Sequence, residues 1–161
     1  MCIFCKIVAG EIPCFKIYED EKTLAFLDIE PCADGHTMVI PKKHSDAFIE
    51  MPPEEAGELF EAVNKVSNQI MSKMENVTGM TIGMNTYESA GQTVMHTHIH
   101  IFPRFSGDGG GTTHSIVHSA KSSDMEYLKL ILFEKKEKDM RKSGGFDPIK
   151  LIRFVNKTWY K

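Results

Sequence analysis

Three histidines stand two residues apart in the stretch His96-Thr97-His98-Ile99-His100. A spacing of two is the period of a β-strand, so the pattern predicts that the three imidazoles share one face while Thr97 and Ile99 point to the other. Imidazole at neutral pH serves as a nucleophile, a proton carrier or a metal ligand. Three of the seven histidines of the chain lie within these five residues. This clustering favours a site with separate roles for the imidazoles over a strand whose polar face carries histidine by chance.

A second candidate group combines residues that are far apart in the sequence. Cys2 and Cys5 form a Cys-x-x-Cys motif, and His44 and His96 are available as two further ligands. Two thiolates and two imidazoles make a closed, tetrahedral structural zinc site. The spacing alone leaves two other interpretations open. One is a redox pair, although the βαβ pattern that should follow it is absent, and the other is a pair of half-buried free thiols.

Length and composition restrict the class of protein. The chain has 161 residues, 42% hydrophobic and 25% charged, which suits one globular domain with an appended tail. The net charge of −3 makes no overall polycation for nucleic acid or a membrane surface, and no apolar run approaches the roughly 18 residues of a membrane span. The first six residues contain no signal-peptide core. We therefore expect a cytosolic protein without nucleic-acid or membrane partners, whose four cysteines are thiols or metal ligands.

The elements that must position these groups follow from the hydrophobic patterns. A helix is expected at about 53–75, where two prolines and two glutamates precede apolar residues that recur every three or four positions. Strands are expected at 15–19, 23–28, 36–40, 81–85 and 96–104. Three strands, a helix and two strands predict an α+β fold with an antiparallel sheet.

The last third of the chain differs from the rest. We expect a domain at 1–106 and an extension at 107–161 that consists of a flexible Gly-rich link, a helix at about 122–140 and a basic tail. From residue 129 onward there are ten Lys or Arg against four Asp or Glu, whereas the preceding residues carry nine against eighteen. We expect the basic segment to pack on the acidic body or on a partner subunit, because it has no aromatic-basic RNA motif.

The histidine stretch resembles the signature of the histidine triad (HIT) family, in which apolar residues separate the histidines. Other segments resemble the small nucleotide-binding branch of that family and occur in the same order, namely 3–7, 10–13, 26–29, 35–44 and 91–94. The resemblance covers residues 1 to about 105. It implies a five-stranded antiparallel sheet per subunit with one long helix, and a homodimer in which two such sheets are joined.

The resemblance also implies roles for individual residues. His98 matches the family's nucleophile, which attacks the α-phosphorus of a purine nucleoside phosphoramidate of the AMP or GMP type. A covalent nucleotidyl-histidine forms, and water then releases the nucleoside monophosphate. His36 and His100 match the histidines that flank the nucleophile. The residues expected at the substrate are Asp28 at the ribose hydroxyls, Asn85 near the ribose or α-phosphate, and Gln92 and Thr93 in the phosphate loop.

Cys2, Cys5, His44 and His96 match a zinc site of some bacterial-type members. The resemblance therefore implies Zn²⁺ in a structural role and no organic cofactor. Physical considerations agree with chemistry that needs no catalytic metal, because no carboxylate cluster of the kind that binds Mg²⁺ lies near the triad in the sequence.

Three alternatives to a phosphoramidase remain. The first is a dinucleoside polyphosphate hydrolase of the same superfamily, and the second is a nucleotide-binding module without catalysis. The third is a zinc hydrolase in which His96, His98 and His100 bind one ion. A flat strand spreads three such imidazoles over about 13 Å, which is too far for a single zinc ion without strong bending.

Overall fold

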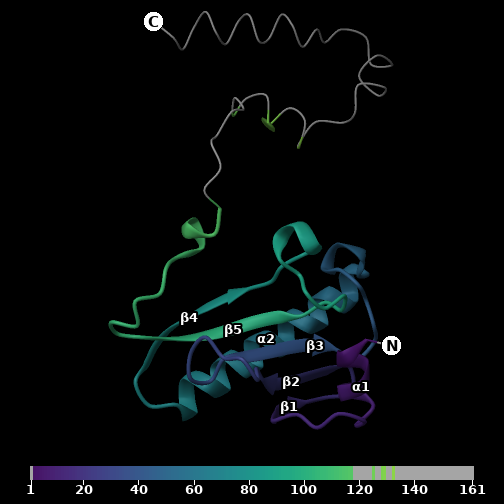
Figure 1. Cartoon of the computed structure of the whole chain (residues 1–161), viewed down its shortest axis with the longest axis horizontal. Helices are drawn as coiled ribbons and strands as arrows, with labels where there is room; N and C mark the ends of the chain where they lie inside the picture. The colour runs from purple at the N-terminus through teal and green to yellow at the C-terminus, as the bar shows by residue number, and fades with distance from the viewer. Residues whose placement is uncertain (1, 118–124, 126–127, 130–131, 133–161) are drawn as a thin grey trace, which may run out of the picture. The chain divides into compact units, whose positions relative to one another are not determined.

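The computed structural model in Figure 1 describes residues 2–117, 125, 128–129 and 132. The chain divides into two compact units, Met1–His114 and Ser115–Lys161. Every residue that the sequence assigns to a site belongs to the first unit. Among the described residues, no helix combines the length and the apolar character needed to cross a membrane.

A five-stranded sheet forms the centre of the first unit (Figure 1). Its strands are β1 (Lys16–Glu19), β2 (Thr23–Leu27), β3 (Thr37–Pro41), β4 (Val77–Gly83) and β5 (Ile99–Phe105). They lie in the order β1-β2-β3-β5-β4, and each neighbouring pair is antiparallel. The predicted α+β fold with an antiparallel sheet is confirmed, and the expected homodimer stays a prediction.

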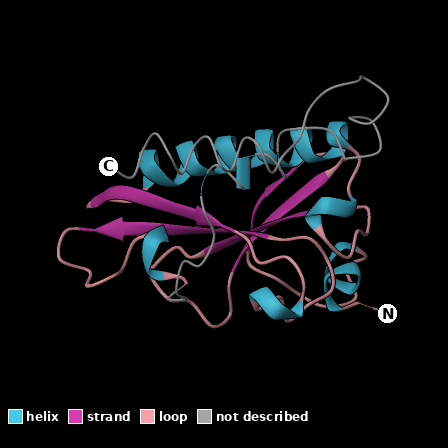
Figure 2. Cartoon of the chain, turned by 90° about the horizontal axis from the view of Figure 1, so that it is seen from above, coloured by secondary structure: helices cyan, strands magenta, loops and turns pink. Residues whose placement is uncertain are grey.

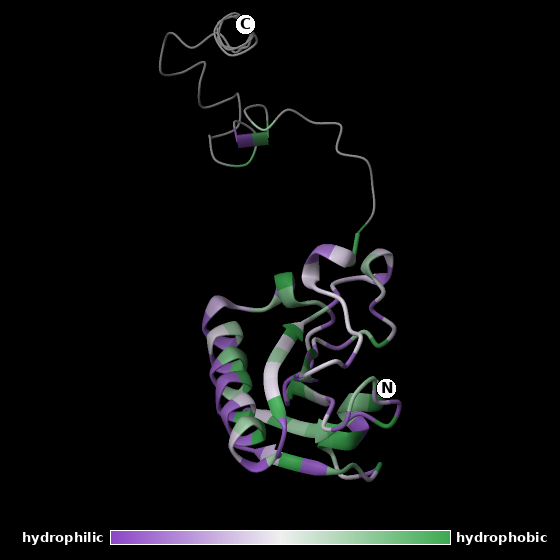
Figure 3. Ribbon diagram, turned by 90° about the vertical axis from the view of Figure 1, so that its left-hand side faces the viewer, coloured by the Kyte–Doolittle hydropathy of each residue, from purple (hydrophilic) through white to green (hydrophobic). Residues whose placement is uncertain are grey.

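The long helix α2 (Pro53–Lys73) covers one face of the sheet, as Figure 2 shows. Proline in the first turn and Glu54 and Glu55 near the positive end of the helix dipole favour a helix start here. Polar and apolar residues alternate along α2 in Figure 3, as in an amphipathic helix. Its buried residues Leu59, Ala62, Val63, Val66 and Ile70 form one core with Ala25, Val39, Ile99 and Ile101 of the strands.

A short helix, α1 (Ile3–Val8), contributes to a second core on the other face. Phe4 of α1 is buried there together with Leu24, Phe26, Met38 and Ile40 of β2 and β3. Met38 and His100 are paired in the register of β3 and β5, so His100 belongs to this face and its neighbours Ile99 and Ile101 belong to the α2 face. The predicted alternation along the histidine strand is therefore present from Ile99 onward.

The histidine strand is shorter than expected. β5 begins at Ile99, so only His100 of the three histidines lies on a strand, and the expected strand start at residue 96 is wrong. The three rings still lie on one side of the chain, because Phe4 contacts the rings of both His96 and His98, and the His98 ring contacts that of His100. The ladder with β3 starts at the pair Val39 and Ile99. Before that pair the backbone bonds elsewhere, since the Thr97 N–H donates to the Ser45 carbonyl at 2.7 Å. This loop contact turns the chain out of the sheet.

Two further boundaries differ from the expected ones. β4 begins at Val77, four residues before the expected strand at 81–85, because Asn76 adopts a positive φ of 67° and turns the chain directly from α2 into the sheet. Gly79 interrupts the alternating pattern in this strand and hid its first half from sequence analysis. The helix α1 was not expected at all, because six residues without a side-chain N-cap carry no helix signal.

The Gly-rich link expected after residue 106 contains a hydrogen-bonded turn. The guanidinium of Arg104 donates to both carboxylate oxygens of Asp108 at 2.6 and 2.7 Å, and the same carboxylate accepts from the backbone N–H groups of Phe105 and Gly110. The helix expected at about 122–140 and the basic tail lie, apart from a few isolated positions, outside the described residues.

Candidate active site and metal centre

Four side chains from three separate segments meet beside the N-terminus of the chain. Cys2 caps α1 and Cys5 lies within it, His44 follows β3, and His96 precedes β5. Their ligand atoms all lie within 4.8 Å of one another. We call these four residues the thiol–imidazole cluster. It contains every residue that the sequence suggested for zinc.

The hydrogen-bond partners of the two imidazoles assign their tautomers. His96 Nε2 donates to the carbonyl oxygen of Pro41 at 2.8 Å, and His44 Nε2 donates to Asp46 Oδ1 at 2.7 Å. Both Nδ1 atoms therefore carry lone pairs, and they face each other at 3.2 Å. Two lone pairs at this distance repel unless a cation lies between them. Burial and the neighbouring Cys2 raise the pKa of the Cys5 thiol, so a nearby cation would favour its ionised form.

The distances in the cluster agree with a tetrahedral ion. Zinc bonds of about 2.05 Å to nitrogen and about 2.3 Å to sulfur give tetrahedral edges of about 3.3 Å between nitrogens and about 3.6 Å between nitrogen and sulfur. The observed edges are 3.2 Å between the two Nδ1 atoms, and 3.2, 3.6 and 3.7 Å from Sγ atoms to Nδ1 atoms. The cluster therefore fits Zn²⁺, with no position left open for a substrate.

His98 lies two residues beyond the cluster and is 5% exposed. Its Nδ1 donates to the carbonyl oxygen of His96 at 2.7 Å. Because a carbonyl oxygen only accepts, the proton of the neutral ring is on Nδ1 and the lone pair is on Nε2. The ring makes edge-to-face contacts with Phe4, at a centroid distance of 5.4 Å, and with His100, at 5.0 Å. The fold thus leaves the lone pair of the neutral His98 ring on Nε2.

His36 and His100 form a hydrogen-bonded pair beside His98, which we call the imidazole pair. The N–H of Cys32 donates to His36 Nδ1 at 3.3 Å, and His36 Nε2 donates to His100 Nδ1 at 2.9 Å. His100 therefore carries its own proton on Nε2 as a hydrogen-bond donor. Burial, and then the neighbouring His98 and His36, lower the pKa of His100 to about 4. Burial also lowers the pKa of His36, against the attraction of Asp28, so both rings are neutral at pH 7.

Asp28 directly follows Leu27, the last residue of β2. One carboxylate oxygen accepts the N–H of Glu30 at 2.9 Å, and the other lies 3.5 Å from His36 Nδ1. His36 Nδ1 accepts a hydrogen bond from the Cys32 N–H and therefore carries no proton that it could donate to the Asp28 carboxylate. Asp28, His36 and His100 are close enough to suggest a metal site. A proton stands between the two rings, however, so their lone pairs do not converge on one point.

The residues expected at the phosphate differ in what they contact. Gln92 is buried, and its amide donates to the carbonyls of Asp46 and Val94 at 2.6 and 3.0 Å while its oxygen accepts the Tyr87 N–H at 2.7 Å. All these bonds hold the loop in shape. Thr93 is exposed. Asn85 is also exposed, and its amide donates to the Gly91 carbonyl at 3.5 Å.

Sequence analysis missed several contributors to the site. The carbonyl oxygens of Pro41 and His96 set the tautomers, and backbone groups leave no signal in a sequence. Phe4 gave no signal because an apolar residue in a short segment is usually core. Tyr87 adopts φ 68° and ψ 163°, a rare conformation for a residue with a side chain, and its hydroxyl donates to Glu50 at 2.8 Å. A tyrosine between Thr86 and Glu88 gives no sequence signal for a positive φ.

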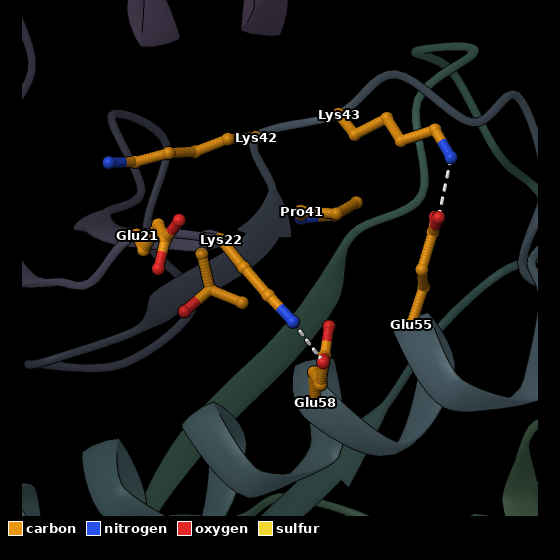
Figure 4. Close-up of a pocket in the computed structure, with 8 residues that line it drawn as sticks. Glu21, Lys22, Pro41, Lys42, Lys43, Glu55 and Glu58 are labelled. Atoms are coloured by element: carbon orange, nitrogen blue, oxygen red, sulfur yellow. Dashed lines mark hydrogen bonds and ion pairs between the residues drawn. The ribbon is translucent and has the colours of Figure 1, made fainter.

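A cavity of about 280 Å³, shown in Figure 4, is lined by none of the predicted site residues. Its three lysines are each paired with a glutamate. Lys43 contacts Glu55 at 2.5 Å, Lys42 contacts Glu19 at 2.9 Å, and Lys22 contacts Glu58. Each lysine is therefore occupied by a carboxylate, and no histidine or cysteine lines the cavity. The candidate chemistry therefore stays with the histidines.

The fold is a five-stranded antiparallel sheet in which His96 and His98 precede β5 and His100 lies on it. The model of the HIT domain matches residues 9–107, which is more than half of the chain, and the chain therefore belongs to the HIT family. This finding confirms the resemblance. Among the described residues, no group of metal ligands contains all three histidines of the triad.

Characterised and uncharacterised relatives agree with this assignment. Protein hit of Bacillus subtilis is 50% identical over 111 residues, covering 68% of this chain and 76% of that protein. Adenosine 5'-monophosphoramidase hnt1 of Schizosaccharomyces pombe is 43% identical over 103 residues, covering 64% and 74%. Adenylylsulfatase HINT3 of Arabidopsis thaliana is 37% identical over 130 residues, covering 81% and 66%.

Solved structures share the fold. A member of the HIT family from Bacillus subtilis has a TM-score of 0.69 at 40% identity and covers 91% of this chain and 99% of its own. A Zn-bound histidine triad family protein from Mycobacterium smegmatis has a TM-score of 0.65 at 39% identity and covers 67% and 78%. The fold that these proteins share is the one that positions the two groups of histidines described above.

Proposed function

We propose that this protein hydrolyses purine nucleoside phosphoramidates of the AMP or GMP type through a nucleotidyl intermediate on His98. The observation that carries the proposal is the 2.7 Å hydrogen bond from His98 Nδ1 to the His96 carbonyl, which leaves the lone pair on Nε2. Relatives named adenosine 5'-monophosphoramidase and adenylylsulfatase support a HIT-type nucleotide hydrolase.

The first step transfers the nucleotidyl group to the protein. The Nε2 lone pair of His98 attacks the α-phosphorus, and the bond from phosphorus to the amine nitrogen breaks with its electron pair on nitrogen. The amine leaves with a proton that it takes from solvent water, while the neutral Nε2–H of His100 stays in place as a hydrogen-bond donor. The His96 carbonyl stabilises the positive charge that develops on the His98 ring, because it accepts the Nδ1–H.

The second step returns the protein to its starting state. Water attacks the same phosphorus, loses a proton and releases the nucleoside monophosphate, and the electron pair of the phosphorus–nitrogen bond returns to His98 Nε2. Throughout both steps the imidazole pair keeps a neutral N–H donor beside the phosphoryl group, because burial lowers the pKa of His100 to about 4. A positioned donor of this kind stabilises negative charge on phosphoryl oxygens.

The remaining assignments concern binding. We assign Asp28 to the ribose hydroxyls, since its carboxylate is partly exposed and close to His36. Asn85 and Thr93 are exposed on the loop before the triad and suit the ribose and the phosphate. Gln92 contributes to the phosphate loop by holding its backbone.

Zinc in the thiol–imidazole cluster is part of the proposal. Cys2, Cys5, His44 and His96 would hold Zn²⁺ as a structural ion that ties α1 to the loops before and after the sheet strands. The named Zn-bound family member from Mycobacterium smegmatis supports a zinc site in this class. A reducing, cytosolic location suits the two thiol ligands. We further propose that the protein is a homodimer and that the basic tail after residue 128 influences the preference for leaving groups.

The test uses a fluorogenic adenosine phosphoramidate with wild type, His98→Ala, and His114→Ala as a matched control at an exposed histidine outside the site. We expect turnover by wild type and by His114→Ala, a loss of about 10⁴-fold or more in His98→Ala, and little change on brief chelation. Immediate loss on chelation would instead indicate a metal hydrolase, and tight AMP binding without turnover would indicate a binding module.

A second measurement addresses the intermediate. Rapid quenching of the wild-type reaction followed by intact-mass analysis should show one added nucleotidyl group that maps to His98. A dinucleoside polyphosphate should be compared as substrate under the same conditions, and a higher kcat/KM for it would favour that activity over the phosphoramidase.

A further inference from the structure

His96 connects the two chemical groups through different atoms. Its side chain belongs to the thiol–imidazole cluster, where Nδ1 faces two thiols and His44 Nδ1. Its backbone carbonyl accepts the Nδ1–H of His98 at 2.7 Å. Any shift of His96 that follows loss of the ion must therefore also move the group that assigns the tautomer of His98.

Phe4 makes a second connection. It lies between Cys2 and Cys5 in α1, and it is buried. Its ring contacts the His98 ring at a centroid distance of 5.4 Å and an interplanar angle of 78°, and the His96 ring at 5.8 Å and 76°. Edge-to-face contacts of this kind restrain the orientation of an aromatic ring. Phe4 and His100 together contact the His98 ring, so removal of Phe4 leaves one of these two contacts.

The helix that carries Phe4 is weak by itself. α1 has six residues and no side-chain cap at its N-terminus. Helices of this length do not form alone in water, because nucleation costs more than a few hydrogen bonds return. Its residue Cys5 and its N-cap Cys2 belong to the thiol–imidazole cluster, which also includes His44 after β3 and His96 before β5. A bound ion would therefore tie α1 to the loop that ends at His98.

We propose that Phe4 is a positioning residue for His98, and that a metal ion in the thiol–imidazole cluster holds both Phe4 and the His96 carbonyl against the His98 ring. The ion then influences catalysis without contact with the substrate. The kinetic part of this inference rests on the proposed function, whereas the structural part concerns the free protein and does not.

The first experiment observes His98 without substrate. Long-range ¹H–¹⁵N NMR of the histidine side chains distinguishes a ring with Nδ1–H from one with mixed tautomers. The full-length protein is compared with Zn²⁺ bound, after prolonged chelation, and after Zn²⁺ is added back. We expect a single Nδ1–H tautomer in the zinc-loaded protein, mixed tautomers after removal, and recovery on addition of Zn²⁺. A single Nδ1–H tautomer in the metal-free protein would overturn the role of the ion.

The second experiment separates positioning from general stability with Phe4→Leu and Leu24→Val. Leu24 is buried in the same core as Phe4 and lies on β2, which does not pair with β5. Both variants should lose stability, but only Phe4→Leu should show mixed tautomers of His98 while it keeps its zinc. Equal spectra for the two variants would overturn the role of Phe4.

Kinetics provide the final readout. Misplacement of a reacting group by about 1 Å can cost about 100-fold in rate, so we expect Phe4→Leu to lower kcat by about 10- to 100-fold and Leu24→Val to change kcat less than about threefold. If wild type has no turnover with the phosphoramidate, the proposed function fails while the NMR comparison still decides the positioning role. If wild type is active and Phe4→Leu retains full kcat, the positioning role fails and the proposed function stands.

Discussion

The thiol–imidazole cluster and the imidazole pair each bring two histidine rings together, but with opposite proton arrangements. In the cluster, the facing nitrogens of His44 and His96 lie 3.2 Å apart and both carry lone pairs. In the pair, the facing nitrogens of His36 and His100 lie 2.9 Å apart and share one proton. The first arrangement suits a cation between the rings, and the second places a proton there.

The difference comes from the partners on the far side of each ring. In the cluster, Pro41 and Asp46 present acceptors, which place the protons on Nε2 and leave Nδ1 for a ligand bond. In the pair, the backbone N–H of Cys32 is a donor, which makes Nδ1 of His36 an acceptor and sends its proton toward His100. Two histidines close together therefore do not indicate a metal site until the outer hydrogen bonds are known.

The largest expected effect is the loss of a cluster ligand. Cys5→Ser should abolish tight zinc binding and destabilise the fold, because the free energy of binding a structural zinc ion contributes to folding. We expect less than one equivalent of zinc per chain by elemental analysis and a decrease of roughly 10 °C or more in Tm. Cys32→Ser, at an exposed cysteine outside the cluster, is the matched control and should keep one equivalent. Full zinc content in Cys5→Ser would remove Cys5 from the ligand set.

The pH dependence of stability should reveal the imidazole pair. The pKa of His100 is about 4 in the folded protein against an ordinary 6.5, so the unfolded chain binds the proton first as the pH falls. Stability should therefore be full above pH 6.5 and decrease between pH 6.5 and about 4, by an amount on the order of 3 kcal/mol. Urea unfolding of wild type and His100→Gln at several pH values measures this, and equal slopes for both would contradict the assignment.

Removing the donor of the imidazole pair should affect turnover more than metal content. We expect His100→Ala to lower kcat by about 100-fold, because a positioned hydrogen-bond donor for the phosphoryl oxygens is lost. Zinc content should remain at that of wild type, since His100 is not in the cluster. His114→Ala, at an exposed histidine, should keep wild-type kcat. A His100→Ala protein that loses zinc would show that the two groups are not separable in the way we describe.

The smallest effect should follow from the acceptor outside the cluster. Asp46→Ala removes the partner of His44 Nε2, and such losses typically weaken metal affinity by about 10- to 100-fold. Competition with a chromophoric chelator measures the affinity. Asp34→Ala, at another exposed carboxylate, should retain wild-type affinity. An unchanged affinity in Asp46→Ala would mean that the tautomer of His44 is set in another way.

Much of the fold was accessible from the sequence because its signals are local. The helix expected at about 53–75 is present as Pro53–Lys73, since its apolar spacing and its N-terminal prolines act within a few turns. The strands expected at 15–19, 23–28 and 36–40 are each present within one residue at either end, with 36–40 observed as Thr37–Pro41. The boundary of the histidine strand was not accessible, because it depends on where Val39 pairs and on a bond between Thr97 and Ser45.

The sequence was enough to predict which residues belong to the candidate site, but not how their side chains contact one another. The histidine triad motif predicted His98, and the Cys-x-x-Cys motif predicted the thiol–imidazole cluster, because closely spaced histidines and cysteines are rare in sequences. Gln92 was expected at the phosphate, but its amide is occupied by loop backbone, which only the fold could decide. Phe4 belongs to a helix that was not predicted, and its contact with His98 joins residues that are 94 positions apart in the numbering.

By itself the sequence determined the strand period, the long helix, the family and the chemical types available at the site. The tertiary structure decided which nitrogen of each histidine carries the proton, because that depends on which backbone group each ring meets. The Pro41 carbonyl reaches His96 from a distant strand, whereas the His96 carbonyl and the Cys32 N–H lie near His98 and His36 in the chain and are oriented toward them by the fold. A backbone group is identical in every residue but proline, so its use as a partner becomes visible only when the chain is folded.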